Sequence, residues 1–256
     1  MPKKLLYEQP LQERIRTFIR AENLLARSEF FASRSQVWDS QAAIQSIIDL
    51  SALFSRGDVK SEVLKEIERQ HLTLNELSTK PGVDKNQLEL ILAQQQVLTK
   101  ELHALKGKIG SHLESNEFLS SIRQRATMPG GPCDFDLPAY YHWLKNPNKV
   151  RQEDLINWLR PFTTIRTAID LILKIIRKGT NTQAEVAEKG FYQQNLDSAI
   201  SYQLIRVLLP ADSIYFPEIS AGKQRFSIRF FQQGSPLQHQ QQCKENITFE
   251  IACCMI

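Results

Sequence analysis

The carboxylates and the histidine in the middle of the chain come nearest to a catalytic arrangement. Asp134 and Asp136 would share one face of an extended segment, as a general acid and base pair requires, and His142 is a second candidate base. No adjacent residue identifies a nucleophile. The prolines and glycines of residues 129–132 instead favour turn and helix-capping roles for both carboxylates. We therefore predict that the protein is not an enzyme.

Cysteine and histidine side chains of the C-terminal region are candidate metal ligands. His239 and Cys243 have helix-like spacing, and Cys253 and Cys254 follow. However, the sequence has no Cys-x-x-Cys pair, and adjacent cysteines on a strand point to opposite faces, so both could hardly bind one tetrahedral ion. Gly130-Gly131 lies between prolines, without the lysine and serine of a phosphate-binding loop. We predict neither a metal nor a cofactor, and we expect the cysteines to be reduced thiols.

Basic side chains are the stronger functional signal. The chain carries 32 Lys and Arg against 28 Asp and Glu, and residues 121–180 hold 10 basic and 5 acidic side chains. Arg16 and Arg20 would share one face of a helix, and Arg225 and Arg229 would share the solvent face of a strand. Such groups attract an acidic partner. A nucleic-acid-binding protein that uses the basic 121–180 region is the alternative, although a net charge of +4 is low for that role.

The elements that must position these side chains are mostly helical between residues 11 and 178. Apolar residues recur there every three or four positions. Asp58 and Asp84 are placed to cap helix starts, Gly57 to end a helix, and Pro161 to kink one. We predict helices over residues 11–31, 37–54, 59–74, 84–105, 115–126 and 155–176. The third and fourth should form an antiparallel hairpin, because a short loop joins them.

The pattern changes to strands after residue 190. Residues 202–209, 224–231 and 247–253 are rich in β-branched and aromatic residues, and residues 225–230 alternate strictly between polar and apolar. The Gln-rich residues 234–242 are expected to form a hairpin loop. The fold class is therefore α+β, a mostly helical domain plus a small antiparallel β-sheet domain. We expect a helical domain over 11–127 and a helix-plus-strand domain over 128–256, which residues 1–10 join.

Membrane insertion and export are not expected. No apolar run reaches the ~18–20 residues of a membrane-spanning helix, and Leu5-Leu6-Tyr7 is too short for the apolar part of a signal peptide. We therefore expect a cytoplasmic protein.

Several motifs follow one another along the whole chain in the order found in one known family. The most specific is the run Pro129-Gly130-Gly131-Pro132-Cys133-Asp134-Phe135-Asp136-Leu137-Pro138. The others are Leu6-Tyr7-Glu8-Gln9-Pro10-Leu11, Phe54-Ser55-Arg56-Gly57-Asp58-Val59, Pro81-Gly82-Val83-Asp84, Ile122-Arg123-Gln124-Arg125, Tyr215-Phe216-Pro217-Glu218-Ile219-Ser220, Lys223-Gln224-Arg225-Phe226-Ser227-Ile228-Arg229-Phe230 and Phe249-Glu250-Ile251-Ala252-Cys253-Cys254. The sequence resembles the ZapD family of FtsZ-associating cell division proteins.

The resemblance implies a non-enzymatic homodimer with a helical and a β-strand domain. It implies that the protein binds the C-terminal tail of FtsZ through a basic pocket and crosslinks FtsZ filaments, which promotes Z-ring assembly at mid-cell. The chain departs from the family pattern at Glu117 and Tyr141, where basic or imidazole side chains are expected in relatives. The expected tail-binding residues are Arg16, Arg20, Arg56, Arg123, Arg125, Tyr141, Lys223, Arg225 and Arg229.

Overall fold

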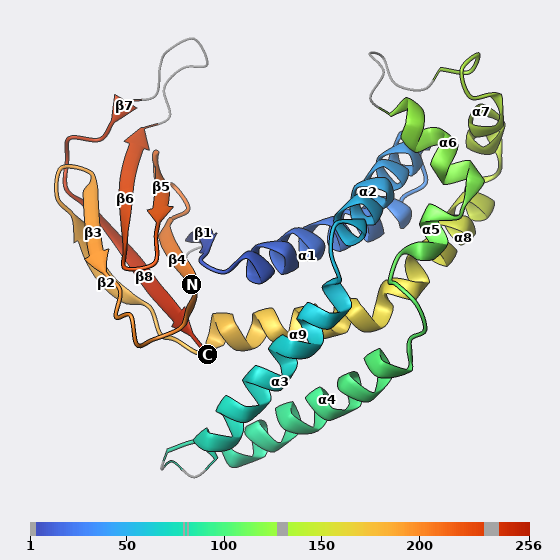
Figure 1. Cartoon of the computed structure of the whole chain (residues 1–256). Coiled ribbons are helices and arrows are strands. Elements are labelled where there is room, and N and C mark those ends of the chain that lie inside the picture. The colour runs from blue at the N-terminus through green and yellow to red at the C-terminus, as the bar shows by residue number, and fades with distance from the viewer. Residues whose placement is uncertain (1–3, 79, 81, 127–132, 233–240) are drawn as a thin grey trace. The chain divides into compact units, whose positions relative to one another are not determined.

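The structure is a computed structural model that describes residues 4–78, 80, 82–126, 133–232 and 241–256 (Figure 1). Its contacts divide the chain into two compact units. The helical unit is Thr17–Ile172, and the sheet unit combines Met1–Arg16 with Leu173–Ile256. The unit boundaries fall within α1 (Glu13–Ala32) and α9 (Thr163–Lys178). Helices and antiparallel sheets together confirm the predicted α+β class.

The units divide the chain at other positions than the expected domains. Residues 133–172 lie with the helical unit rather than with the strands, because their helices pack against α2 (Val37–Ser55). The N-terminal strand β1 (Lys4–Pro10) pairs along its whole length with β4 (Tyr202–Pro210) in the sheet unit.

The first four predicted helices and the helix near 115–126 are present, but the helix predicted over 155–176 is divided into two, and the helices Ser111–Glu114 and Pro138–Lys145 were not predicted. Between α1 and α9 it contains α2, α3 (Val59–Leu77), α4 (Lys85–Ala104), α5 (Ser111–Glu114), α6 (Glu117–Arg125), α7 (Pro138–Lys145), α8 (Asn148–Leu159) and the 3-10 turn η1 (Arg160–Phe162). The predicted hairpin is confirmed, since α3 and α4 run antiparallel side by side (Figure 1). None of the helices in the described parts of the chain is long and apolar enough to cross a membrane.

Local signals in the sequence set the helix ends. Asp58 accepts a hydrogen bond from the Ser61 backbone N–H at 3.0 Å, and Asp84 accepts one from Gln87 at 3.1 Å, so both predicted caps are confirmed. Pro161 lies in η1, between α8 and α9, where the missing backbone donor of proline interrupts the α-helical ladder as predicted. The apolar pattern of residues 37–54 predicts that Val37 is buried, and this prediction is wrong because Val37 is exposed at the start of α2.

The sheet unit contains two antiparallel sheets that share one core. One sheet has the strand order β1-β4-β8-β2, and the other has β3-β6-β5 with β7 paired to β6. The strands introduced here are β2 (Gln183–Ala187), β3 (Phe191–Asn195), β5 (Tyr215–Ala221), β6 (Arg225–Gln232), β7 (Gln241–Gln242) and β8 (Ile247–Met255). Phe230 of β6 and Phe249 of β8 join the two sheets, with ring centroids 5.1 Å apart.

The three predicted strands correspond to β4, β6 and β8, but the five other strands that the structure describes, including the two-residue β7, were not predicted. β1, β2, β3 and β5 lie at sheet edges, where one side of the strand pairs with nothing in its own sheet and fewer side chains must be buried. Their sequences therefore lack the apolar alternation that identifies a half-buried strand. The predicted turn at 129–132 and most of the predicted loop at 234–242 lie outside the described residues.

Gly190 shows why a glycine is needed between β2 and β3. Its φ is 71°, and a Cβ at this position would lie 2.5 Å from the backbone oxygen of Cys243. A side chain would therefore clash with backbone as well as strain the turn. The turn leads into β3, which pairs with β6, the strand that carries Arg225 and Arg229.

Candidate partner-binding site

Two predicted arginines meet at one hollow in the helical unit. Arg20 lies on the exposed side of α1, opposite the buried Phe18 and Leu25, and Arg56 follows the last residue of α2. We call this the Arg20–Arg56 hollow; it measures about 540 Å³ and is lined by Arg20, Asn23, Leu24, Asp49, Ala52, Leu53 and Arg56. Residues distant in sequence meet here because α1 and α2 form a hairpin.

The charge of this hollow is positive. Neither Arg20 nor Arg56 forms an ion pair with any residue that the structure describes. Asp49, which also lines the hollow, is already engaged by Arg27, whose guanidinium lies 2.7 Å from its Oδ2. Leu24 and Leu53 add an apolar wall. The hollow can therefore accept a ligand that combines a carboxylate with an apolar side chain.

Arg123 and Arg125 occupy the last turn of α6, where cations suit the negative end of the helix dipole. Arg125 is engaged by Asp136 at 3.3 Å. Arg123 is exposed and borders a narrow apolar gap of about 10 Å³, which is too small for a ligand group. These two arginines are thus placed at the surface, but one of them already has a carboxylate partner.

The carboxylates considered for catalysis have structural roles. Asp136 pairs with Arg125, and Asp134 accepts a hydrogen bond from the backbone N–H of Phe135 at 3.0 Å. The favoured assignment of both to turn stabilisation agrees with these contacts. His142 is exposed on α7.

Tyr141 borders a surface pocket that includes an exposed tryptophan, which was not among the predicted site residues. Lys145 places its Nζ 4.9 Å from the centre of the Tyr141 ring. The pocket has a volume of about 180 Å³ and also includes Trp38, whose side chain is 79% exposed. An exposed tryptophan is typical of protein-binding surfaces. Its one sequence signal was its position off the apolar stripe of α2.

The remaining predicted residues belong to the sheet unit. Arg225 and Arg229 project from the exposed face of β6, while Phe226, Ile228 and Phe230 on the other face are at most 1% exposed, as the alternation predicted. Lys223 lies exposed in the turn before β6. Glu218 of β5 stands directly across from Arg229 and offsets part of its charge. Arg16 pairs with Glu13 within α1.

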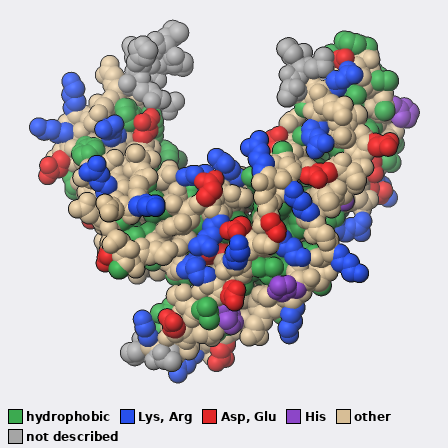
Figure 2. Space-filling view, viewed as in Figure 1, with side chains coloured by type: hydrophobic (Ala, Val, Ile, Leu, Met, Phe, Trp, Pro, Cys, Tyr) green, Lys and Arg blue, Asp and Glu red, His purple; other side chains and the backbone are tan. Residues whose placement is uncertain are grey.

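Several of the basic side chains of residues 121–180 are engaged by contacts inside the protein. Arg166 pairs with Glu29 and Asp170, Arg177 pairs with Glu8, and Arg151 is buried against backbone oxygens. On the face shown in Figure 2, basic and acidic side chains are interspersed over each unit. These contacts weaken the argument for the nucleic-acid alternative, because fewer of the basic side chains are available to a partner.

Metal and thiol chemistry finds no support in the parts of the chain that the structure describes. No group of three or more His, Cys, Asp and Glu there could hold a metal ion. Burial raises the pKa of Cys253 and of Cys254 to about 11, so both stay protonated at neutral pH, when they are poor ligands and nucleophiles. All four cysteines are outside disulfides. His239 lies outside the described residues.

The described residues thus form an α+β protein with an arginine-lined hollow. A family model described as the cell division protein ZapD matches residues 19–229. The cell division protein ZapD of Methylococcus capsulatus (strain Bath) is 36% identical over 256 residues, which cover the whole of both chains. The chain belongs to the ZapD family of cell division proteins.

Proposed function

We propose that this protein binds the C-terminal tail of FtsZ and, as a homodimer in the cytoplasm, crosslinks FtsZ filaments to promote Z-ring assembly at mid-cell. Membership of the ZapD family supports the cell division role. The Arg20–Arg56 hollow is the observation that carries the binding proposal. It offers two guanidinium groups without a carboxylate partner among the described residues, next to an apolar wall.

The expected tail is a flexible segment that is acidic and partly apolar. A carboxylate of the tail would pair with Arg20 or Arg56, and an apolar side chain would pack against Leu24 and Leu53. Exposed ion pairs contribute about 0–1 kcal/mol each, and ordering a flexible tail offsets part of the contact energy. A single site should therefore have roughly micromolar affinity.

Dimerisation would allow weak single sites to crosslink filaments. Two sites on one dimer, facing a filament with many tails, raise the overall affinity by a factor of about 10²–10⁴. Arg225, Arg229 and Lys223 are the proposed further contacts with the tail, because they are exposed cations on or next to one strand.

Sedimentation of FtsZ filaments tests this function. The protein is mixed with full-length FtsZ or with FtsZ lacking its C-terminal tail, and pelleted bundles are measured at low centrifugal force. We expect bundling of full-length FtsZ only, and less of it as salt rises, since charges in solution are screened over ~8 Å at physiological ionic strength. Equal bundling of both forms would refute tail recognition. A monomer by sedimentation equilibrium would refute crosslinking by a dimer.

Substitution of single arginines tests the residues. Arg20→Glu and Arg229→Gln should each weaken binding of a tail peptide with little change in melting temperature, because both side chains are exposed and neither forms an ion pair with a described residue. Arg160→Glu is the matched control, since Arg160 is exposed and its guanidinium bonds to Asn157 rather than to a carboxylate. Wild-type affinity in both variants would remove the two arginines from the site.

A further inference from the structure

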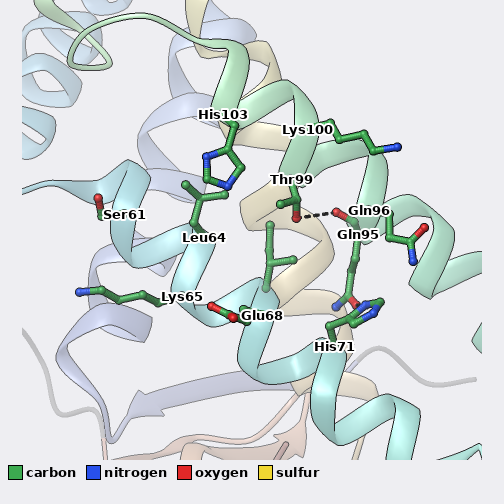
Figure 3. Close-up of a pocket in the computed structure, with 11 residues that line it drawn as sticks. Ser61, Leu64, Lys65, Glu68, His71, Gln95, Gln96, Thr99, Lys100 and His103 are labelled. Carbon is green, nitrogen blue, oxygen red and sulfur yellow. Dashed lines mark hydrogen bonds between the residues drawn. The ribbon is translucent and has the colours of Figure 1, made fainter.

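A second hollow lies apart from all the predicted tail-binding residues, between the two helices of the hairpin. We call it the α3–α4 groove (Figure 3). Its volume is about 570 Å³, within the range of ligand sites. Its lining runs from Ser61 to His71 on α3 and from Gln95 to His103 on α4. Ten residue steps along α3 correspond to a groove about 15 Å long.

The hollow is an open groove, because its floor residues are buried and its edge residues are exposed. Ile67 and Gln95 are buried and form the floor, and Leu64 and Thr99 are half-buried above them. Lys65, Glu68, Gln96, Lys100 and His103 are exposed along the edges. An apolar floor with polar edges, running parallel to two helices over about three turns, matches one face of a third helix.

The floor contains a polar group that the hairpin leaves unpaired. Gln95 is 1% exposed, and its Oε1 lies 3.1 Å from Nδ1 of His71, as seen at the lower end of Figure 3. Its Nε2 is also buried, yet it has no hydrogen-bond partner among the described residues. Most buried polar groups in folded proteins are paired, so this donor is free to bond to an acceptor of a bound ligand.

The charged residues that line the groove are two lysines and one glutamate. Lys65 and Lys100 extend to opposite sides of the helix pair in Figure 3, and the imidazoles of His71 and His103 lie between them. Glu68 is the carboxylate of the lining. Lys65 forms an ion pair with Glu62, but both side chains are well exposed, so this pair is weak and exchangeable. A ligand with carboxylates on both flanks of an apolar stripe complements this arrangement.

We propose that the α3–α4 groove binds an acidic amphipathic helix of a partner protein. Leucine-like side chains of that helix pack on Leu64 and Ile67, and its flanking carboxylates pair with Lys65 and Lys100. One side-chain oxygen, reached by a small shift of the groove lining, accepts from Nε2 of Gln95. The proposal is independent of FtsZ-tail binding, because it uses none of the residues assigned to the tail.

A synthetic helix serves as the probe. It is a fluorescein-labelled peptide of about 18 residues, long enough to be helical, with leucines spaced i, i+3, i+4 and i+7 and glutamates on both sides of the leucine stripe. Fluorescence anisotropy with the full-length protein should show saturable binding. A peptide of the same composition with the stripe scrambled, and one with lysine in place of every glutamate, should each bind at least about tenfold more weakly.

Paired variants test the position of the helix. Leu64→Glu puts a carboxylate into the groove and should weaken binding of the acidic peptide at least about tenfold. Leu72→Glu is the matched control on the same helix, because Leu72 is already 61% exposed and lies outside the lining. Lys100→Glu should weaken binding about threefold to tenfold, and Lys85→Glu, at the far end of α4, should leave it unchanged.

Gln95→Leu tests the unpaired amide. Removing the donor should weaken binding of the acidic peptide about fivefold. A thermal melting curve of the variant should confirm that the protein remains folded. Unchanged affinity in this variant would show that Gln95 does not recognise the ligand.

Three results would overturn the proposal. The scrambled and the designed peptide could bind equally, Leu64→Glu and Leu72→Glu could have equal effects, or Leu64→Glu could change the oligomeric state in sedimentation equilibrium. The last result would make the groove a contact between two copies of this chain. Binding of an FtsZ tail peptide should be unaffected by Leu64→Glu, which separates this proposal from the proposed function.

Discussion

Arg151 and Arg20 are the same residue type in the same helical unit, but the fold uses them in opposite ways. Arg151 is 4% exposed and donates to Ser40 Oγ at 3.0 Å and to the backbone oxygens of Ser35, Leu144 and Asn146. Arg20 is exposed and has no ion pair with any described residue. The comparison teaches that a charge counted in the sequence is available to a partner only if the fold leaves it unengaged.

The same contrast separates two regions of the molecule. The arginines of residues 121–180 form the largest basic excess in the chain, yet Arg125, Arg166 and Arg177 are engaged by carboxylates. The less basic region of α1 and α2 provides the Arg20–Arg56 hollow, where two guanidinium groups remain available. Removing an engaged arginine should therefore affect stability, and removing an available one should affect binding.

The largest effect is expected at Arg151. Arg151→Leu leaves several backbone oxygens of the α1–α2 and α7–α8 connections without a donor, and it should lower the free energy of unfolding by about 3 kcal/mol. Urea unfolding measures this change. Arg160→Leu, at an exposed arginine, should change it by less than about 0.5 kcal/mol. Equal effects of the two substitutions would contradict the distinction between engaged and available arginines.

The next effect is expected in the sheet unit, at Glu8. Its carboxylate joins β1 to two arginines, with Arg177 Nη2 at 2.7 Å and Arg206 Nε at 3.2 Å. Glu8→Ala leaves two half-buried cations facing each other and should cost about 2 kcal/mol in thermal or urea unfolding. Glu13→Ala, which removes the exposed pair with Arg16, should cost less than about 0.5 kcal/mol. A stable Glu8→Ala protein would show that this network is not structural.

The available arginines should show the reverse behaviour. The double variant Arg20→Glu/Arg56→Glu should weaken binding of the FtsZ tail peptide about tenfold, or about 1.4 kcal/mol, and leave the melting temperature unchanged. The loss should be larger at low salt, because both contacts are exposed. Isothermal titration at two salt concentrations measures it. A drop in melting temperature with intact binding would place these arginines in the engaged class.

The smallest effect on the free energy of unfolding is expected at Asp58, whose carboxylate is held by contacts with nearby residues. Hydrogen bonds from the Ser61 side chain and backbone lower the pKa of Asp58 below its ordinary value of 3.8. The cap therefore stabilises the folded protein at neutral pH and is lost as pH falls through this lowered pKa. Asp58→Ala should cost about 1 kcal/mol at pH 7.

The pH dependence of the same variant provides its control. The difference in unfolding free energy between wild type and Asp58→Ala should shrink as pH falls below about 4, since a protonated cap no longer accepts both bonds as a carboxylate. Urea titrations at several pH values follow this difference. A constant difference would indicate that Asp58 stabilises the helix in another way than by its charge.

Much of the fold was predictable because its signals are local. Asp58 and Asp84 cap helices with hydrogen bonds that span three residues, and Pro161 interrupts a ladder through its own missing donor. The strict alternation of residues 225–230 likewise predicted which face of β6 is buried. The edge strands were missed because they bury too little apolar surface to impose a pattern.

The sequence predicted which residues contribute to the candidate site, but not how they are arranged or paired. Sequence reasoning named Arg20 and Arg56, but it also named Arg125 and Arg16, which already have carboxylate partners. It overlooked Trp38 and the α3–α4 groove, because an exposed tryptophan and a gap between two helices have no periodic signature.

By itself, then, the sequence determined the α+β class, several helix ends, the central strands and the ZapD family. Those properties depend on the spacing of residues along the chain and on hydrogen bonds between near neighbours. Only the tertiary structure decided which arginines are engaged, that Arg20 meets Arg56, and that Nε2 of Gln95 lies beneath a groove without a partner among the described residues. Pairing, burial and concavity arise between segments far apart in the chain, so no local pattern contains them.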